Sequence, residues 1–104
     1  GFDKAEANAI TRALGDVGIS VTNEMRDCYH KINLAQWKLL EQGKMTREEV
    51  KMRRFKLLFQ EFDIKVSPQE VAKHYQDYLG QGHYFIEEPK KFYRNYQRDF
   101  VSIL

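Results

Sequence analysis

Apolar residues recur every three or four positions along most of this chain, and that spacing places them on one face of an α-helix. The clearest stripe predicts a helix between Thr22 and Gly43. It consists of Met25, Cys28, Tyr29, Ile32, Ala35 and Leu39. Similar stripes predict three further helices, which follow Thr46, Ser67 and Pro89. The last of these, from Pro89 to Leu104, would be amphipathic.

Start and stop signals set the expected boundaries of the first two helices. Asp3 and Glu6 form a pair like a capping box, in which each side chain reaches the other's backbone N–H. We therefore place the first helix at about residues 4–14 and expect Gly15 to adopt the left-handed conformation that ends it. Thr22 should cap the second helix, and Gly43 should end it.

The third and fourth helices carry stronger start signals. Thr46 and Glu49 match the full capping-box pattern, and Ser67 is followed by a proline at the first helical position. Gly80 and Gly82 are expected to stop the fourth helix. Nothing between these segments resembles a ladder of strands. The sequence therefore predicts an all-α fold, an up-down bundle with short connections.

Composition limits the function classes. A length of 104 residues fits one domain, and 42% apolar residues favour a packed globule over disorder. The net charge of +2 is too small to indicate nucleic-acid binding, which we do not expect. One cysteine excludes an internal disulfide and fits a reducing compartment, so a cytoplasmic location is expected. No apolar run is long enough to span a bilayer, and no signal-peptide pattern opens the chain.

Candidate nucleophiles and metal ligands are few. Cys28 and His30 are two positions apart on one predicted helix and so point to different sides, and Cys28 lies on the apolar stripe. A buried small hydrophobic residue is the favoured interpretation of this cysteine. His74 with Asp77, and Asp27 with His30, would each supply two ligands on a helix face. A metal site needs three or four, so we expect neither pair to hold one.

Two residues point more clearly to a site. Basic residues on the third and fifth predicted helices are expected to form solvated faces, but Arg54 directly precedes the inward Phe55. An arginine at such a margin often has a fixed partner or an anionic ligand. Trp37 is the only tryptophan and shares a patch with Asn33, four positions earlier. The pattern alone favours a second buried face for Trp37, and the functional alternative is the wall of a pocket.

Several short motifs, taken in order, resemble the helical cap of haloacid dehalogenase superfamily hydrolases, closest to the bacterial pyrimidine 5′-nucleotidase type. They are Phe2-Asp3-x-Ala5-Glu6, Ile32-Asn33-x-x-x-Trp37, Glu41-x-Gly43-Lys44-x-Thr46-x-x-Glu49, Arg54-Phe55 and Gly82-His83. The resemblance implies a four-helix cap over residues 1–86 that helps to choose the substrate. Residues 87–104 depart from the family pattern and are expected to form the fifth helix, packed on the same domain.

The resemblance also implies what this chain lacks. The family's aspartate nucleophile, acid-base aspartate and Mg²⁺-binding acids belong to a core that these residues do not match. We therefore expect an isolated cap that is not catalytic and holds no cofactor, its parent being a Mg²⁺-dependent nucleotide or small phosphomonoester hydrolase. Asn33, Trp37 and Arg54 fall at motif positions that would face substrate. The alternative is a small interaction module that forms a homo-oligomer through an exposed apolar face.

Overall fold

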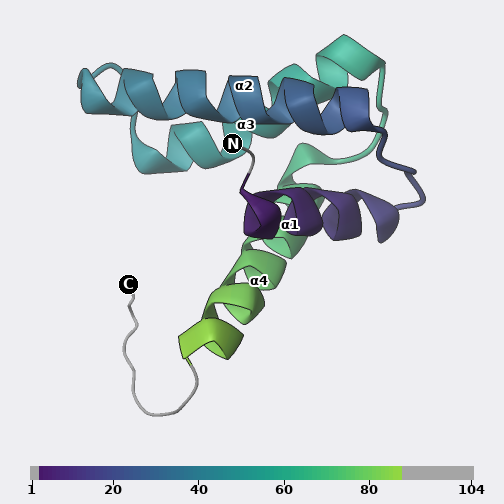
Figure 1. The fold of residues 1–104 in the computed structure, drawn as a ribbon. Helices are drawn as coiled ribbons and strands as arrows, with labels where there is room; N and C mark the ends of the chain where they lie inside the picture. The colour runs from purple at the N-terminus through teal and green to yellow at the C-terminus, as the bar shows by residue number, and fades with distance from the viewer. Residues whose placement is uncertain (1–2, 88–104) are drawn as a thin grey trace.

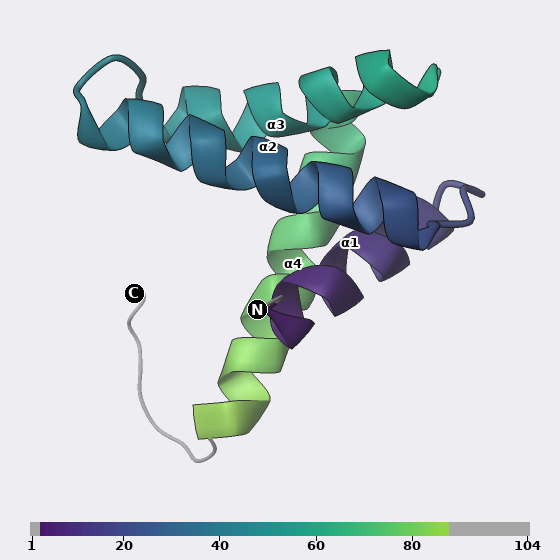
Figure 2. The ribbon, with the colours of Figure 1, turned by 45° about the horizontal axis from the view of Figure 1, so that its top comes forward.

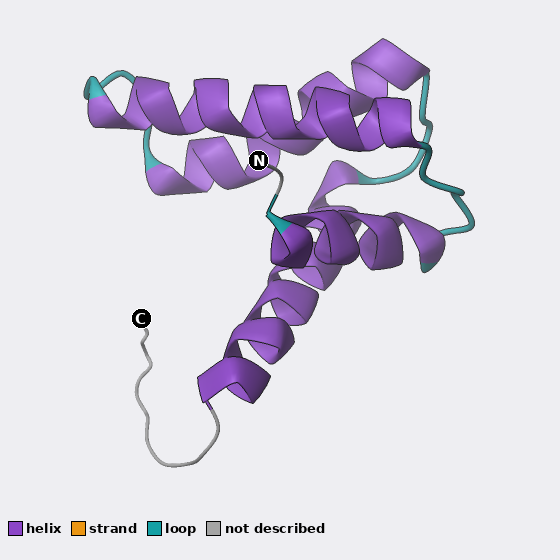
Figure 3. Ribbon diagram, viewed as in Figure 1, coloured by secondary structure: helices purple, strands orange, loops and turns teal. Residues whose placement is uncertain are grey.

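The computed structural model of the protein describes residues 3–87 and consists there of four α-helices without any strand. They are α1 (Lys4–Gly15), α2 (Asn23–Glu41), α3 (Arg47–Phe62) and α4 (Pro68–Glu87). Figure 3 shows short loops as the only connections between them. The predicted all-α class is confirmed, whereas the fifth helix, predicted from Pro89 to Leu104, lies outside the described residues.

The four helices form a ring of neighbours. α1 packs against α2 and α4, and α3 packs against α2 and α4, whereas the backbones of α1 and α3, and of α2 and α4, stay apart over the described residues. Helices α2 and α3 lie side by side as an antiparallel hairpin (Figure 1). Helix α4 runs obliquely to that hairpin in both views (Figures 1 and 2), so a simple up-down order is not confirmed.

Aromatic side chains fill the middle of this ring. Tyr29 of α2, Phe55 of α3 and Tyr75 of α4 are all buried, and their three pairwise ring-centroid distances are each 5.4 Å. Each such pair contributes about 0.5 to 1.5 kcal/mol beyond its buried area. Ile10 and Leu14 of α1 are fully buried against the same cluster. One core therefore joins all four helices.

Local signals place most helix ends where the sequence predicts them. The Thr46 hydroxyl accepts from the Glu49 N–H at 3.1 Å, and the Glu49 carboxylate accepts from the Thr46 N–H at 2.8 Å. This reciprocal pair confirms the predicted capping box. Gly43, with φ 74°, is left-handed after α2, and the next N–H, of Lys44, donates to the Leu39 carbonyl. That bond closes a Schellman motif, as a glycine at this position favours.

Three expectations about helix boundaries and faces are wrong. Gly15 remains helical, and the left-handed glycine after α1 is Gly18, with φ 85°. Helix α4 continues through its two glycines to Glu87, because a glycine inside a helix costs only about 1 kcal/mol and does not break it. In α2, Ala35 is exposed and Gln36 is buried instead, since the stripe turns away from the core there.

Within the described residues, none of the helices combines the length and apolar character needed to cross a bilayer.

Candidate functional site

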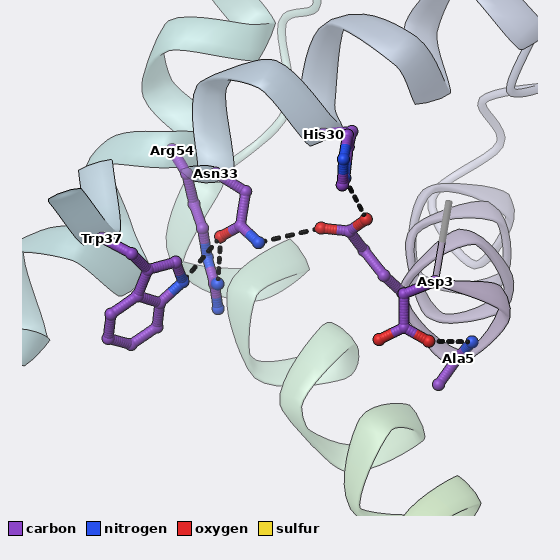
Figure 4. A network of polar contacts seen from close by, with 7 residues as sticks. Asp3, Ala5, His30, Asn33, Trp37 and Arg54 are labelled. Atoms are coloured by element: carbon purple, nitrogen blue, oxygen red, sulfur yellow. Dashed lines mark hydrogen bonds and ion pairs between the residues drawn. The ribbon is translucent and has the colours of Figure 1, made fainter. Parts of the chain in front are cut away.

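Helix α2 presents three polar side chains on one face, and they organise the candidate site. His30, Asn33 and Trp37 are spaced by three and four positions, which brings them above one another along a helix. Figure 4 shows His30, Asn33 and Trp37 lined up along α2, with Arg54 of α3 beside Asn33. Glu6 of α1 bonds both His30 and Asn33. The site is therefore a polar network that crosses the bundle.

The amide of Asn33 is the centre of the network. Its Oδ1 accepts from Trp37 Nε1 at 2.9 Å and from Arg54 Nη1 at 2.8 Å, and its Nδ2 donates to Glu6 Oε2 at 2.8 Å. An indole and a guanidinium can only donate, and an ionised carboxylate can only accept. The chemistry of the three partners thus fixes which way the amide points.

Arg54 is held entirely inside the protein. It is 2% exposed, and its second terminal nitrogen, Nη2, donates to Gln76 Oε1 of α4 at 3.1 Å. The guanidinium carbon lies 4.8 Å from the ring centroid of Tyr75 and 5.9 Å from that of Trp37. Cation–π attraction and the hydrogen bonds that its two terminal nitrogens donate stabilise the buried charge. The structure thus gives Arg54 fixed partners, which is one of the two alternatives that its position next to Phe55 indicates.

Glu6 is the member of the network that sequence reasoning missed. Its carboxylate does not return to the backbone N–H of Asp3; Asp3 alone caps α1, by accepting from the Ala5 N–H at 3.0 Å. Instead Glu6 is 5% exposed and bonds His30 Nδ1 at 2.8 Å in addition to Asn33. The sequence signal that could have indicated a buried carboxylate partner is the spacing of His30, Asn33 and Trp37, which places three polar groups on one helix face.

Trp37 combines a satisfied polar edge with a partly open ring. Its N–H is bonded to Asn33, while the side chain as a whole is half-buried. The guanidinium carbon of the exposed Arg47, the first residue of α3, lies 5.9 Å from the indole centroid. The side chain is therefore neither a fully buried core residue nor a free surface one, and its role as the wall of a pocket stays a prediction.

A second polar cluster joins α1 to α4 at the other end of α1. His74 Nδ1 lies 3.0 Å from Asp16 Oδ2, and the Tyr78 hydroxyl donates to the same oxygen at 2.5 Å. The bond to Asp16 raises the pKa of Tyr78, and partial desolvation adds to this. The ring of Tyr78 also lies 4.2 Å from the guanidinium carbon of Arg12.

The structure pairs the histidines differently from the metal pairs considered in the sequence. His74 bonds Asp16 and His30 bonds Glu6, in each case across two helices. In the part of the chain that the structure describes, no three or more His, Cys, Asp and Glu side chains come together as a metal site would need. Burial raises the pKa of the Cys28 thiol, and the nearby Glu61 carboxylate raises it further, which disfavours the reactive thiolate.

Comparison with known proteins finds two relatives of this chain. The chain is 34% identical over 99 residues to the HAD-hydrolase YfnB of Bacillus subtilis, a match that covers 95% of this chain and 42% of that protein. It is 36% identical over 80 residues to the pyrimidine 5′-nucleotidase PynA of Streptococcus pneumoniae, covering 77% of this chain and 34% of that protein. No family model and no solved structure matches the chain. It spans less than half the length of these two relatives. The chain is thus homologous to a part of a HAD-hydrolase and of a pyrimidine 5′-nucleotidase, which confirms its resemblance to the haloacid dehalogenase hydrolases.

Proposed function

We propose that this chain is the helical cap of a haloacid dehalogenase-type hydrolase and that it helps to choose the substrate. The observation that carries the proposal is the form of the match: 95% of the chain aligns with 42% of YfnB. The described residues of this chain form four helices without a strand and have one core of their own. A self-contained helical unit of this kind is what an inserted cap requires.

The chemistry would belong to the rest of such a protein. Transfer of a phosphoryl group needs a fixed nucleophile and neutralisation of the phosphate charge. The family implies Mg²⁺ for that purpose, but the described residues hold no carboxylate cluster that fits a divalent ion. We therefore derive no reaction step from this chain, and we place Mg²⁺ binding in the portion of the parent hydrolase that this chain does not match.

A nucleoside monophosphate or another small phosphomonoester is the proposed substrate of the parent protein. The name of PynA, a pyrimidine 5′-nucleotidase, supports this class. The location of Trp37, a half-buried aromatic ring beside the guanidinium of Arg47, also suits a substrate with a planar part. Other phosphomonoesters with a planar group fit the same argument, and the assay can test them as well.

The experiment exchanges the matched segment. This chain would replace the aligned 99-residue stretch of YfnB, and the chimera would be assayed against a panel of nucleoside monophosphates and p-nitrophenyl phosphate. YfnB itself and a YfnB variant with a short linker in place of the segment are the controls. A cap predicts that the chimera hydrolyses p-nitrophenyl phosphate with changed ratios of kcat/KM among the nucleotides.

Two results would contradict the cap proposal. The first is release of phosphate by this chain alone with Mg²⁺ and nucleoside monophosphates, which would show that the chemistry is here. The second is a folded chimera whose substrate ratios equal those of the linker variant, which would show that the segment has no influence on substrate choice.

Self-association stays a second proposal for the isolated chain. Leu34 of α2 is 57% exposed, the only large hydrophobic side chain so exposed within residues 3–80. A homo-oligomer through this face would show a weight-average mass that rises with concentration in light scattering. A constant monomer mass across the concentration series would remove the proposal.

A further inference from the structure

The half-buried Trp37 and the exposed cation beside it, Arg47, form a surface whose role the fold does not explain. Arg47 is exposed, and its guanidinium carbon lies 5.9 Å from the indole centroid. Among the described residues, the ion pairs are His30–Glu6, Lys65–Asp63 and His74–Asp16, so no carboxylate neutralises Arg47 there. This cation is therefore available to an anion from outside, and it stands next to an aromatic ring.

Trp37 is held in place before any ligand arrives. Its N–H donates to Asn33 Oδ1 at 2.9 Å, which fixes the rotation of the indole. The same oxygen accepts from the buried Arg54, whose guanidinium also lies 5.9 Å from the indole centroid. A half-buried ring that is fixed on two sides loses little freedom on binding, and such preorganisation favours affinity.

Asn33 and Arg54 themselves have little left to offer a ligand. The amide of Asn33 uses its oxygen for two donors and its nitrogen for Glu6. Arg54 donates from both terminal nitrogens, and its Nε–H has no partner among the described residues but is buried, because the residue is only 2% exposed. Burial therefore keeps Arg54 away from an external anion, and the groups that bond Asn33 would be costly to leave unpaired.

We propose that Trp37 and Arg47 form the substrate-contacting surface of this cap, which binds a planar group that carries a negative charge, and that Asn33 and Arg54 position the indole without touching substrate. The proposal rests on the proposed cap function and revises the expected substrate contacts, which were Asn33, Trp37 and Arg54. The ring supplies a stacking face, and the guanidinium supplies attraction and hydrogen bonds to the anion.

Binding to the 104-residue chain itself tests this, without any hydrolysis. Because Trp37 is the only tryptophan, its fluorescence and its single indole N–H resonance report on this surface alone. The probes are phenyl phosphate, cyclohexyl phosphate and inorganic phosphate, which share the anion and differ in the attached group. We expect phenyl phosphate to shift the indole resonance and to bind about fivefold to tenfold more tightly than the other two.

Variants separate contact from position. Arg47→Gln should weaken phenyl phosphate binding about fivefold or more, whereas Arg53→Gln, at another exposed position of α3, should leave it unchanged. Asn33→Ala should shift and broaden the indole N–H resonance even without ligand and should weaken binding, with Asn8→Ala, exposed on α1, as its control. A helical circular dichroism spectrum shows that each variant is folded.

The outcomes are distinct from those of the chimera assay. Equal affinity for phenyl and cyclohexyl phosphate, no shift with any probe, or no effect of Arg47→Gln would overturn the assignment of this surface. Such a result could coexist with a chimera that changes substrate choice, which would keep the cap function and move the contact elsewhere. Conversely, specific phenyl phosphate binding with an inert chimera would keep the surface and overturn the cap function.

Discussion

Replacement of Asn33 by aspartate tests the logic of the buried network most directly. Asn33→Asp keeps the shape of the side chain and the oxygen that accepts from Trp37 and Arg54. It replaces the amide nitrogen, which lies 2.8 Å from Glu6 Oε2, by a second carboxylate oxygen. The hydrogen bond from Asn33 to Glu6 is thus replaced by two acceptor oxygens that face each other. Two negative charges also come together at a buried site, since Glu6 is 5% exposed.

The magnitude follows from Coulomb's law and from the hydrogen bonds that become stronger. Two unit charges about 4 Å apart repel by about 4 kcal/mol at an effective dielectric constant of about 20. Stronger hydrogen bonds from Arg54 and Trp37 to the charged oxygen offset about 1 to 2 kcal/mol of this. We expect a net loss of about 2 to 3 kcal/mol at pH 7, a large part of the stability of a small domain.

The sign of the pH dependence is fixed by the same pair. A shared proton relieves the repulsion, so in the folded variant the pKa of the carboxylate pair is raised above its unfolded value. The stability that this proton supplies is present below the unfolded pKa and is lost as the pH rises through the folded one. The difference from wild type should therefore be small near pH 4 and full above about pH 7.

Urea unfolding followed by circular dichroism, repeated from pH 4 to pH 8, measures this difference. Asn8→Asp is the matched control, because Asn8 is exposed on α1 and its replacement should show little pH dependence. If the loss for Asn33→Asp were constant across the series, or if the variant were as stable as wild type at pH 7, the assigned direction of the Asn33 amide would be wrong.

Three further predictions use single substitutions. Arg54→Met should lower the free energy of unfolding by about 2 to 4 kcal/mol, because the hydrogen bonds to Asn33 and Gln76 are lost while the aliphatic part of the side chain still packs. Thermal unfolding measures the loss, and an unchanged Tm would contradict the buried network. Gly43→Ala should destabilise by about 1 kcal/mol, because its φ is 74°, whereas alanine at the helical Gly15 should stabilise by up to about 1 kcal/mol; equal effects in urea would refute the conformational argument. Burial raises the pKa of Tyr29 well above its ordinary value, so the stability that the neutral phenol contributes is full below about pH 10 and is lost as the pH rises further. Tyr29→Phe should reduce this alkaline loss of stability in unfolding experiments at a series of pH values. Parallel stability curves for the variant and the wild type would contradict the prediction.

The features that local sequence determines were predictable. The capping box of Thr46 and Glu49 needs only three residues of spacing, and the left-handed Gly43 needs only the end of an apolar stripe. Both are found where the sequence places them. The choice between Gly15 and Gly18 was not local, because it depends on where the α1 chain must turn toward α2.

The candidate site could be predicted only in part. Asn33, Trp37 and Arg54 come together in one hydrogen-bonded network, while their predicted contact with substrate stays a prediction. Glu6 did not appear among them, because an acid three residues after Asp3 has a sufficient local explanation as a cap. Only the packing of α1 on α2, a tertiary event, brings its carboxylate to His30 and Asn33 instead.

The closed ring of helix neighbours has a consequence for how this domain would come apart. A row of helices can lose an end member while the others stay paired, but here α1 and α4 are also neighbours, so no member occupies an end position. Detaching any one helix must break two interfaces at once and expose the shared aromatic centre. Amide protection should then fall in all four helices together, as one cooperative melting unit.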